Sequence, residues 1–233
     1  MEKNILDEGK QFLITYLKDK SMDYETIHPW RNSWEFVVLH SFRVEGYVKK
    51  ILEKEYHDLT NDEILLTRLA AVLHDVGRIH KREGHALISK EIVCNWLESN
   101  KEIRENIEEK HRLLTLVEKH SNKEEHEDDY CLQVLRDADV LDEIGVMSIF
   151  MCSNWLDRSN PYFFNQLQDR IENFEIGFCE DGYKLLNTQT AKLILDEKAT
   201  FVTNFNNRLK DELFGTEIFG QISIDGYLNN NVY

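Results

Sequence analysis

Two imidazoles and two carboxylates occupy positions where a helical core ordinarily carries apolar side chains. His74 and Asp75 are adjacent and follow an apolar run, residues 69–73. His40 lies on the apolar stripe of an earlier helical pattern, and Asp139 lies inside a third segment with strong apolar periodicity. Burial of an ionised acid without a partner is costly, so a cation is the expected partner of this group.

The four side chains offer a mixed set of nitrogen and oxygen donors. Such a set suits manganese, iron, cobalt, nickel or zinc, and magnesium is compatible with it. Four protein ligands on an ion that takes about six leave positions for water and substrate, which is typical of catalytic metal sites. The residues therefore predict one divalent metal ion, whose identity they leave open, at a catalytic centre.

Each of these residues also has an ordinary structural interpretation. His40 alone is compatible with a hydrogen-bonded core histidine, and Asp139 alone with a surface acid or an ion-pair partner. His74 and Asp75 are compatible with a helix cap, although the helix dipole disfavours an acid at a C-terminal end. The pair Asp137-x-Asp139 is also found in haloacid-dehalogenase phosphatases, but there it follows a parallel strand, and the sequence pattern predicts no strand at this point.

Basic residues gather close to the His-Asp pair in an otherwise acidic chain. The sequence has 28 Lys and Arg against 43 Asp and Glu, a formal net charge of −15. Residues 78–82 form a basic loop, and Arg43 lies about one helical turn beyond His40. Beside a metal ion, such cations can hold a phosphate whose approach the global charge opposes. We expect Arg43, Arg78 and Lys81 to contact substrate; an ordinary solvated loop is the alternative for the last two.

Helical periodicity recurs along almost the whole chain, which has only two prolines and ten glycines. Thr60 with Glu63 forms a capping-box pattern at one helix start, and Asn32 with Glu35 forms another. Gly77 is the expected stop of the helix that follows Thr60. The pattern predicts further helices near the N-terminus and over residues 86–97, 103–120, 130–145, 146–157, 162–173 and 189–213.

Only the tail departs from this pattern. Residues 222–228 place the pair Asp225-Gly226 between two short alternating runs, which predicts a small C-terminal β-hairpin. No repeat, low-complexity segment or obvious linker interrupts the chain. The sequence therefore predicts one all-α domain across residues 1–233.

Composition and charge argue against several classes of protein. A net charge of −15 disfavours a nucleic acid polymer as partner, because affinity for polyanions comes mostly from Lys and Arg. The longest uncharged run, residues 144–156, is far shorter than the roughly 20 apolar residues that cross a bilayer, and the N-terminus lacks a signal-peptide pattern. The four cysteines form no C-x-x-C pair and are expected to be reduced thiols. We expect a cytoplasmic protein without nucleic acid or membrane as partner; its oligomeric state stays open.

The ordered set of motifs resembles the HD superfamily of metal-dependent phosphohydrolases, and most closely its short, stand-alone bacterial members. The similarity spans about residues 34–213, with residues 1–33 as an N-terminal helical extension and 214–233 as a tail. The motifs that carry it are HSFRV (40–44), LHDVGR (73–78), GHA (84–86), DADVLD (137–142) and LNTQTAK (186–192). Val140 departs from the family, which often has Arg there, so a substrate contact from this position is not expected.

The resemblance implies an HD-type helical bundle that hydrolyses a phosphoester in a nucleotide or another small phosphorylated metabolite. It implies that His40, His74, Asp75 and Asp139 bind the metal ion. We expect Asp75 or a neighbouring acid to orient the attacking water. Two alternatives stay open: a di-iron oxygenase on the same fold, and a nucleotide-binding module without catalysis.

His85 and His120 are further candidates, because histidines in corresponding regions of binuclear HD relatives help to hold a second ion. The fuller binuclear pattern uses paired histidines, whereas His120 is followed by Ser121 and Asn122. We therefore expect His85 and His120 to contact substrate phosphate or to be satisfied core histidines, and we expect one tightly bound metal ion per chain.

Overall fold

The computed structural model describes residues 2–100, 109–123, 128–216 and 220–221. The chain divides into two compact units: residues 1–142 with 182–194, and residues 143–181 with 195–233. Helices dominate both units, so the prediction of an all-α fold is confirmed. The part of the 103–120 prediction before residue 109, and the hairpin predicted over 222–228, lie outside the described residues.

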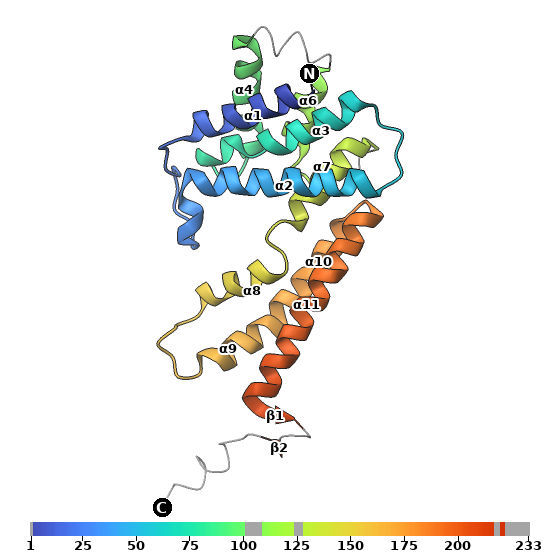
Figure 1. Cartoon of the computed structure of the whole chain (residues 1–233). Helices are drawn as coiled ribbons and strands as arrows, with labels where there is room; N and C mark the ends of the chain where they lie inside the picture. The colour runs from blue at the N-terminus through green and yellow to red at the C-terminus, as the bar shows by residue number, and fades with distance from the viewer. Residues whose placement is uncertain (1, 101–108, 124–127, 217–219, 222–233) are drawn as a thin grey trace, which may run out of the picture. The chain divides into compact units, whose positions relative to one another are not determined.

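The first unit is a bundle of helices with short 3₁₀ turns (Figure 1). Helix α2 packs against α3 and α7, α3 also packs against α1 and α6, and α4 packs against α6 and η2. The elements are α1 (Glu2–Leu17), η1 (Pro29–Asn32), α2 (Trp34–Lys54), α3 (Asn61–Leu73), η2 (Val76–Ile79), α4 (His85–Ser99), α6 (Lys110–Lys119) and α7 (Tyr130–Leu141). The core consists mainly of aliphatic side chains from these helices, including Leu13, Ile51, Leu69, Leu73, Leu113 and Leu135.

Of the two predicted N-terminal capping boxes, the one at Thr60 is confirmed and the one at Asn32 is wrong. The Thr60 hydroxyl accepts a hydrogen bond from the Glu63 backbone N–H, and the Glu63 carboxylate accepts one from the Thr60 N–H, which completes the capping box of α3. At α2, the N-cap residue is Ser33, and no side chain caps the helix. The predicted cap, Asn32, ends η1, and its Oδ1 accepts a hydrogen bond from the Thr26 N–H. The Asn32 side-chain oxygen therefore binds the backbone of the preceding turn and is not available to cap α2.

The second unit contains shorter helices and one long one. Its elements are α8 (Val146–Cys152), η3 (Ser153–Trp155), α9 (Phe163–Arg170), the π-helical turn η4 (Ile171–Glu175), most of α10 (Ile176–Leu185), most of α11 (Gln189–Phe214), β1 (Gly215–Thr216) and β2 (Gly220–Gln221). The helices predicted over 146–157 and 162–173 begin close to their predicted starts. The sequence reasoning missed α10, which continues directly from η4 and contains two glycines, Gly177 and Gly182.

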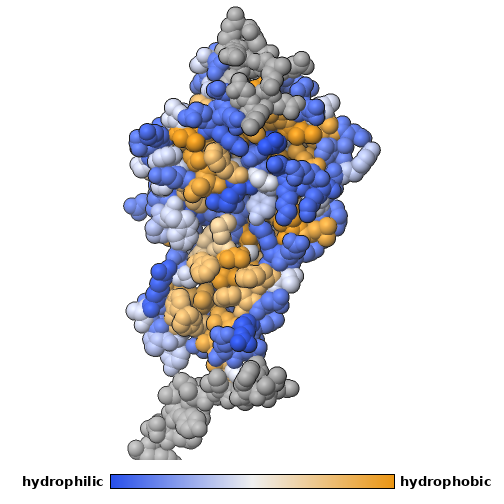
Figure 2. Space-filling view, in the orientation of Figure 1, coloured by the Kyte–Doolittle hydropathy of each residue, from blue (hydrophilic) through white to orange (hydrophobic). Residues whose placement is uncertain are grey.

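The surface of the second unit is rich in exposed hydrophobic side chains. Figure 2 shows hydrophobic residues gathered over the region of α8 to α11. The exposed side chains of this unit include Val146, Met147, Phe150, Trp155, Phe164, Phe174, Phe178 and Phe201. Within the described part of the chain, every helix is too short or too polar to cross a membrane.

Candidate metal centre

The four predicted ligands converge in the first unit, from three helices and one turn. His40 lies on α2, His74 caps the end of α3, Asp75 precedes η2, and Asp139 lies on α7. His40 Nε2 is 3.4 Å from Asp75 Oδ2 and 3.4 Å from Asp139 Oδ1. His74 Nε2 is 3.2 Å from His40 Nε2 and 3.8 Å from Asp139 Oδ1. Residues that are 99 positions apart in the sequence thus present donor atoms to one small volume.

The second ring nitrogen of each histidine shows how the donors are oriented. His74 Nδ1 donates to the Ala71 carbonyl oxygen (2.8 Å), and His40 Nδ1 donates to Asp142 Oδ2 (2.7 Å). A carbonyl or carboxylate oxygen only accepts, so the proton is on Nδ1 and, in the neutral ring, Nε2 carries a lone pair. The two Nε2 lone pairs face each other at 3.2 Å, an arrangement that a cation between them stabilises. Metal-binding histidines typically hold their other ring N–H in this way.

The charges around the four ligands favour a cation at their centre. Burial by itself lowers the pKa of His40, but hydrogen bonds to Asp139, Asp142 and Asp75 outweigh burial and raise that pKa well above its usual value. Burial lowers the pKa of His74 to about 3, which keeps this imidazole neutral and able to bind metal. The group therefore attracts a positive charge, whether that charge is a proton on His40 or a metal ion.

Asp75 has a buried oxygen that accepts no hydrogen bond. Its Oδ1 lies 2.9 Å from His85 Nε2 and 3.5 Å from His120 Nε2, yet the geometry of these contacts leaves that oxygen without a hydrogen-bond donor. Its Oδ2 accepts a hydrogen bond from Arg78 Nη1 (3.0 Å). Although burial raises the pKa of Asp75, Arg78 and the surrounding histidines hold it well below its usual range. A buried, ionised oxygen without a donor is the observation expected of a metal ligand, so the residues present fit a divalent ion.

His85 and His120 form a second group of donors around the same carboxylate. His85 Nδ1 donates to the Arg82 carbonyl oxygen (2.7 Å), His120 Nδ1 donates to the Val117 carbonyl oxygen (2.7 Å), and the two Nε2 atoms are 3.2 Å apart. These two atoms and a carboxylate oxygen of Asp75 lie within 4.8 Å of one another. The arrangement repeats the orientation of the first histidine pair, with three protein ligands instead of four.

Gly77 brings His85 close to Asp75. A Cβ at position 77 would lie 2.5 Å from the Ser89 backbone nitrogen and 2.6 Å from the His85 carbonyl oxygen, so only glycine allows this approach of α4. The Gly77 N–H also donates to Ser89 Oγ (2.9 Å). The prediction that Gly77 stops the preceding helix is wrong, because α3 ends at Leu73 and Gly77 lies inside η2. Close packing against α4 is the reason for glycine at this position.

The structure assigns roles to two acids that the sequence left without one. Asp142 accepts hydrogen bonds from His40 and from both the Nε and the Nη2 of Arg43 (2.7 and 2.8 Å). Asp137 points away from the donor cluster and accepts hydrogen bonds from the backbone N–H groups of Asn187 (2.8 Å) and Thr188 (2.7 Å). Asp142 thus orients a ligand, whereas Asp137 anchors the turn before α11.

The three predicted substrate cations have different surroundings. Arg43 and Arg78 are joined to Asp142 and Asp75, so both lie beside the donor cluster. Lys81 is exposed, and among the described residues no recorded contact joins it to the cluster. Sequence reasoning missed Lys123, whose Nζ is 2.7 Å from Asp139 Oδ2. Its local sequence, a polar stretch after His120, carries no signal that would have singled it out.

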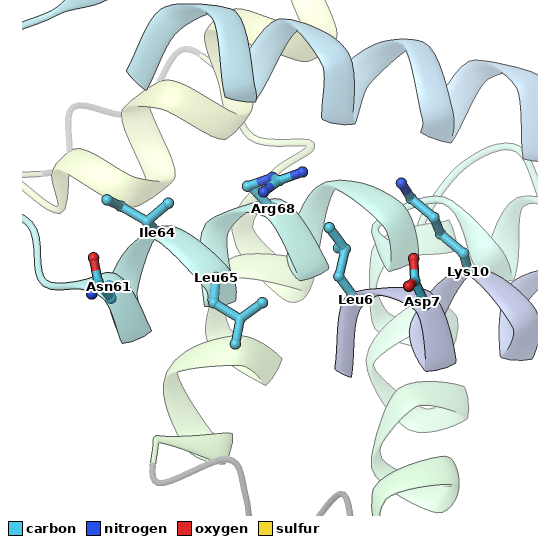
Figure 3. Close-up of a pocket in the computed structure, with 7 residues that line it drawn as sticks. All are labelled: Leu6, Asp7, Lys10, Asn61, Ile64, Leu65 and Arg68. Carbon is cyan, nitrogen blue, oxygen red and sulfur yellow. The ribbon is translucent and has the colours of Figure 1, made fainter. Parts of the chain in front are cut away.

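A pocket of about 460 Å³ lies elsewhere in the first unit, between α1 and α3. Figure 3 shows Lys10 and Arg68 extending from these helices toward α2, where both pair with the Glu45 carboxylate. Leu6, Ile64 and Leu65 supply its apolar wall. The pocket shares no residue with the donor cluster and is not the predicted site.

The helical bundle and its cluster of histidines and aspartates describe a helical protein with a candidate metal centre, and a family model matches the part of the chain that contains this cluster. Residues 37–144 match the family model for the HD domain, so this part of the chain is an HD domain. It contains all four predicted ligands. Together with the donor set, the match supports a metal-dependent HD-type hydrolase. A comparison with curated proteins finds no significant match.

Three solved structures resemble the chain at 19–20% identity, which establishes a shared fold. Lin1889 from Listeria innocua is 20% identical, with a TM-score of 0.57 and coverage of 93% of this chain and 99% of its own. Bacillus subtilis YpgQ in complex with ADP is 20% identical, with a TM-score of 0.58 and coverage of 92% and 97%. A predicted HD superfamily hydrolase from an uncultured Thermotogales bacterium is 19% identical, with a TM-score of 0.55 and coverage of 89% and 92%.

Proposed function

We propose that the chain is a metal-dependent phosphohydrolase that acts on a nucleotide or another small phosphorylated metabolite. The observation that carries this proposal is the orientation of His40 and His74, whose Nε2 atoms face each other at 3.2 Å beside two ionised carboxylates. Such a donor set, with four protein ligands, leaves coordination positions for water and a phosphoryl oxygen. The metal is a single divalent ion, and the donor set is compatible with manganese, iron, nickel, cobalt, zinc or magnesium.

The side chains of the centre have different roles in the proposed reaction. A bound divalent ion supplies Lewis-acid chemistry, because it polarises a phosphoryl oxygen and acidifies water. His40, His74, Asp75 and Asp139 hold that ion. Asp75 or a neighbouring acid accepts a hydrogen bond from the attacking water and orients it. Asp142 keeps His40 in the tautomer that can bind metal.

A phosphorylated substrate explains the cations beside the cluster. The chain has a net charge of −15, and yet Arg43, Arg78 and Lys123 surround the carboxylates of this one site. Part of this positive charge neutralises those carboxylates, and the rest favours an anionic ligand. His85 and His120 lie close enough to Asp75 to contact the same ligand. The ADP in the similar YpgQ structure makes a nucleotide the first substrate class to test.

The test is elemental analysis of the purified protein, followed by a phosphatase screen against nucleotides and sugar phosphates with added manganese. We expect one ion per chain and release of phosphate or pyrophosphate that stops when a chelator is added. Metal-independent turnover would contradict the proposal. Tight binding of a nucleotide without turnover would instead indicate the alternative, a nucleotide-binding module.

The group of Asp75, His85 and His120 favours a second candidate, an HD-fold di-iron oxygenase. Its three donors lie within 4.8 Å of one another, next to the four ligands of the first ion, and Asp75 belongs to both groups. Two irons per chain together with oxygen uptake would support this candidate. One ion per chain and hydrolysis of phosphoesters would exclude it.

We further propose that small phosphorylated molecules, rather than a nucleic acid polymer or a membrane, are the partners of this chain. The acidic balance of the sequence supports this, because affinity for polyanions comes mostly from Lys and Arg. Fluorescence polarisation with labelled oligonucleotides and a vesicle sedimentation assay, each at low and physiological salt, would test the proposal. Tight binding in either assay would contradict it.

A further inference from the structure

Lys123 reaches the donor cluster from outside the helices. It lies in the short turn after α6, three residues beyond His120, and its Nζ is 2.7 Å from Asp139 Oδ2. The hydrogen bond from the Asn122 N–H to the Lys119 carbonyl oxygen (3.2 Å) holds this turn. One turn thus delivers both a histidine and an ammonium group to the same centre.

The two oxygens of Asp139 face different partners. Oδ1 lies 3.4 Å from His40 Nε2 and 3.8 Å from His74 Nε2, on the side of the donor cluster. Oδ2 contacts Lys123, whose side chain is 27% exposed, whereas that of Asp139 is only 12% exposed. The ammonium group is therefore the more exposed partner of this ion pair.

Arg43, Arg78 and Lys123 each donate hydrogen bonds to a carboxylate of the centre, but they differ in how many N–H groups these contacts use. Arg43 contacts both oxygens of Asp142 with two of its nitrogens. Arg78 donates from Nη1 to Asp75 Oδ2, and its backbone carbonyl oxygen accepts a hydrogen bond from the Tyr24 hydroxyl. An ammonium group carries three N–H donors, and the contact with Asp139 occupies one of them. Lys123 therefore has N–H donors that can bind an anionic partner while its contact with Asp139 is kept.

We propose that Lys123 binds a phosphate oxygen of the substrate next to the metal ion. The inference rests on the proposed phosphohydrolase function and names a substrate-binding residue for it. Asp139 connects Lys123 to the metal centre, because its Oδ1 faces the predicted metal ligands and its Oδ2 orients the Lys123 ammonium group. A flexible lysine suits this task, since a phosphate changes shape and charge during reaction and an ammonium group follows it as a point charge.

Binding can be measured without turnover, with manganese and then ADP or inorganic phosphate titrated into the protein by calorimetry. In Lys123→Met we expect the affinity of the manganese-loaded protein for ADP to fall about 10- to 100-fold, which is typical for the loss of a charged hydrogen bond. We expect the affinity for manganese to stay the same or to rise, because a competing cation is removed. Lys123→Arg keeps the charge and should retain most of the ADP affinity.

Lys90→Met is the matched control. Lys90 Nζ also makes a 2.7 Å ion pair with a carboxylate, that of Glu118, on the surface between α4 and α6 and away from the metal ligands. This variant should bind manganese and ADP as the unmodified chain does. Helical circular dichroism of each variant checks that the fold is retained.

The outcomes separate this inference from the proposed function. If the unmodified protein binds ADP and Lys123→Met binds it equally well, Lys123 is only a counter-ion of Asp139 and the inference is wrong. A parallel loss of manganese and ADP affinity would show that Lys123 acts by positioning Asp139, which also overturns it. If the manganese-loaded, unmodified protein binds neither ADP nor phosphate, the proposed substrate class itself fails, and the inference fails with it.

Discussion

Asp142 accepts a hydrogen bond from His40 across 102 positions of the sequence, with 2.7 Å between Asp142 Oδ2 and His40 Nδ1. The contact fixes the imidazole so that Nε2 faces the other predicted metal ligands. Arg43 fixes the carboxylate in turn, through two hydrogen bonds. Arg43 thus positions Asp142, and Asp142 positions His40. This arrangement can be tested by removal of the Asp142 carboxylate.

Asp142→Ala should weaken manganese binding about 10- to 100-fold while leaving the helical fold intact. Loss of a residue that orients a metal-binding histidine typically has an effect of this size, because the ring loses its preferred tautomer and direction. Calorimetric titration with manganese measures the change. Glu53→Ala, which removes an exposed acid of α2 paired with Lys49, should leave the affinity unchanged. Equal affinities in the two variants would rule out the orienting role.

His74→Ala and Asp75→Ala should each abolish tight metal binding and leave a folded helical protein. Both side chains are buried, but their contacts are polar and converge on the metal centre rather than on the aliphatic core. Elemental analysis after dialysis gives the metal content, and circular dichroism confirms the fold. Full metal occupancy in both variants would disprove the assignment of these ligands.

His85→Ala and His120→Ala should reduce turnover more than they reduce metal content. His85 is grouped with the main ligands only through Asp75, whereas His120 also lies within reach of His74 and Asp139. A second ion held by His85, His120 and a shared Asp75 has three protein ligands and is weakly held. Turnover of the best substrate and metal content are measured on the same preparations. A fall from two ions per chain to one in either variant would contradict this and favour the di-iron candidate.

Gly77→Ala should destabilise the protein by about 2–4 kcal/mol, because the new methyl group would collide with the backbone of α4. Gly46→Ala is the matched control, since a Cβ at that position of α2 meets no atom within 4 Å. Removal of a helical glycine there should stabilise the protein by about 0.5–1 kcal/mol. Urea unfolding measures both variants. Similar free energies of unfolding for the two would show that the approach of α4 tolerates a side chain.

Asp137→Ala should reduce stability by about 2–4 kcal/mol and change manganese affinity little. The substitution leaves the backbone N–H groups of Asn187 and Thr188 without their acceptor, and buried donors without partners are costly. Urea unfolding and manganese titration of the same variant separate the two effects. A large loss of metal affinity without a loss of stability would place Asp137 in the metal centre instead.

The sequence by itself determined the helical class and singled out four side chains, His40, His74, Asp75 and Asp139, that the structure brings together. Helical periodicity repeats along the chain and depends only on local spacing, so the predicted starts at Thr60 and near residue 189 agree with the structure. A histidine or an aspartate on an apolar stripe also has few explanations other than a partner inside the core. His40 and Asp139 therefore stood out before any contact between them was known.

The tertiary structure alone decided which polar groups meet. Periodicity places a residue on a face of its helix, but it does not say which side chain from another helix lies opposite. The contact between Asp142 and His40, the facing nitrogens of His85 and His120, and the approach of Lys123 to Asp139 all join separate elements. They exist because α2, α3, α4 and α7 pack around one point, and that packing depends on the whole core rather than on any local pattern.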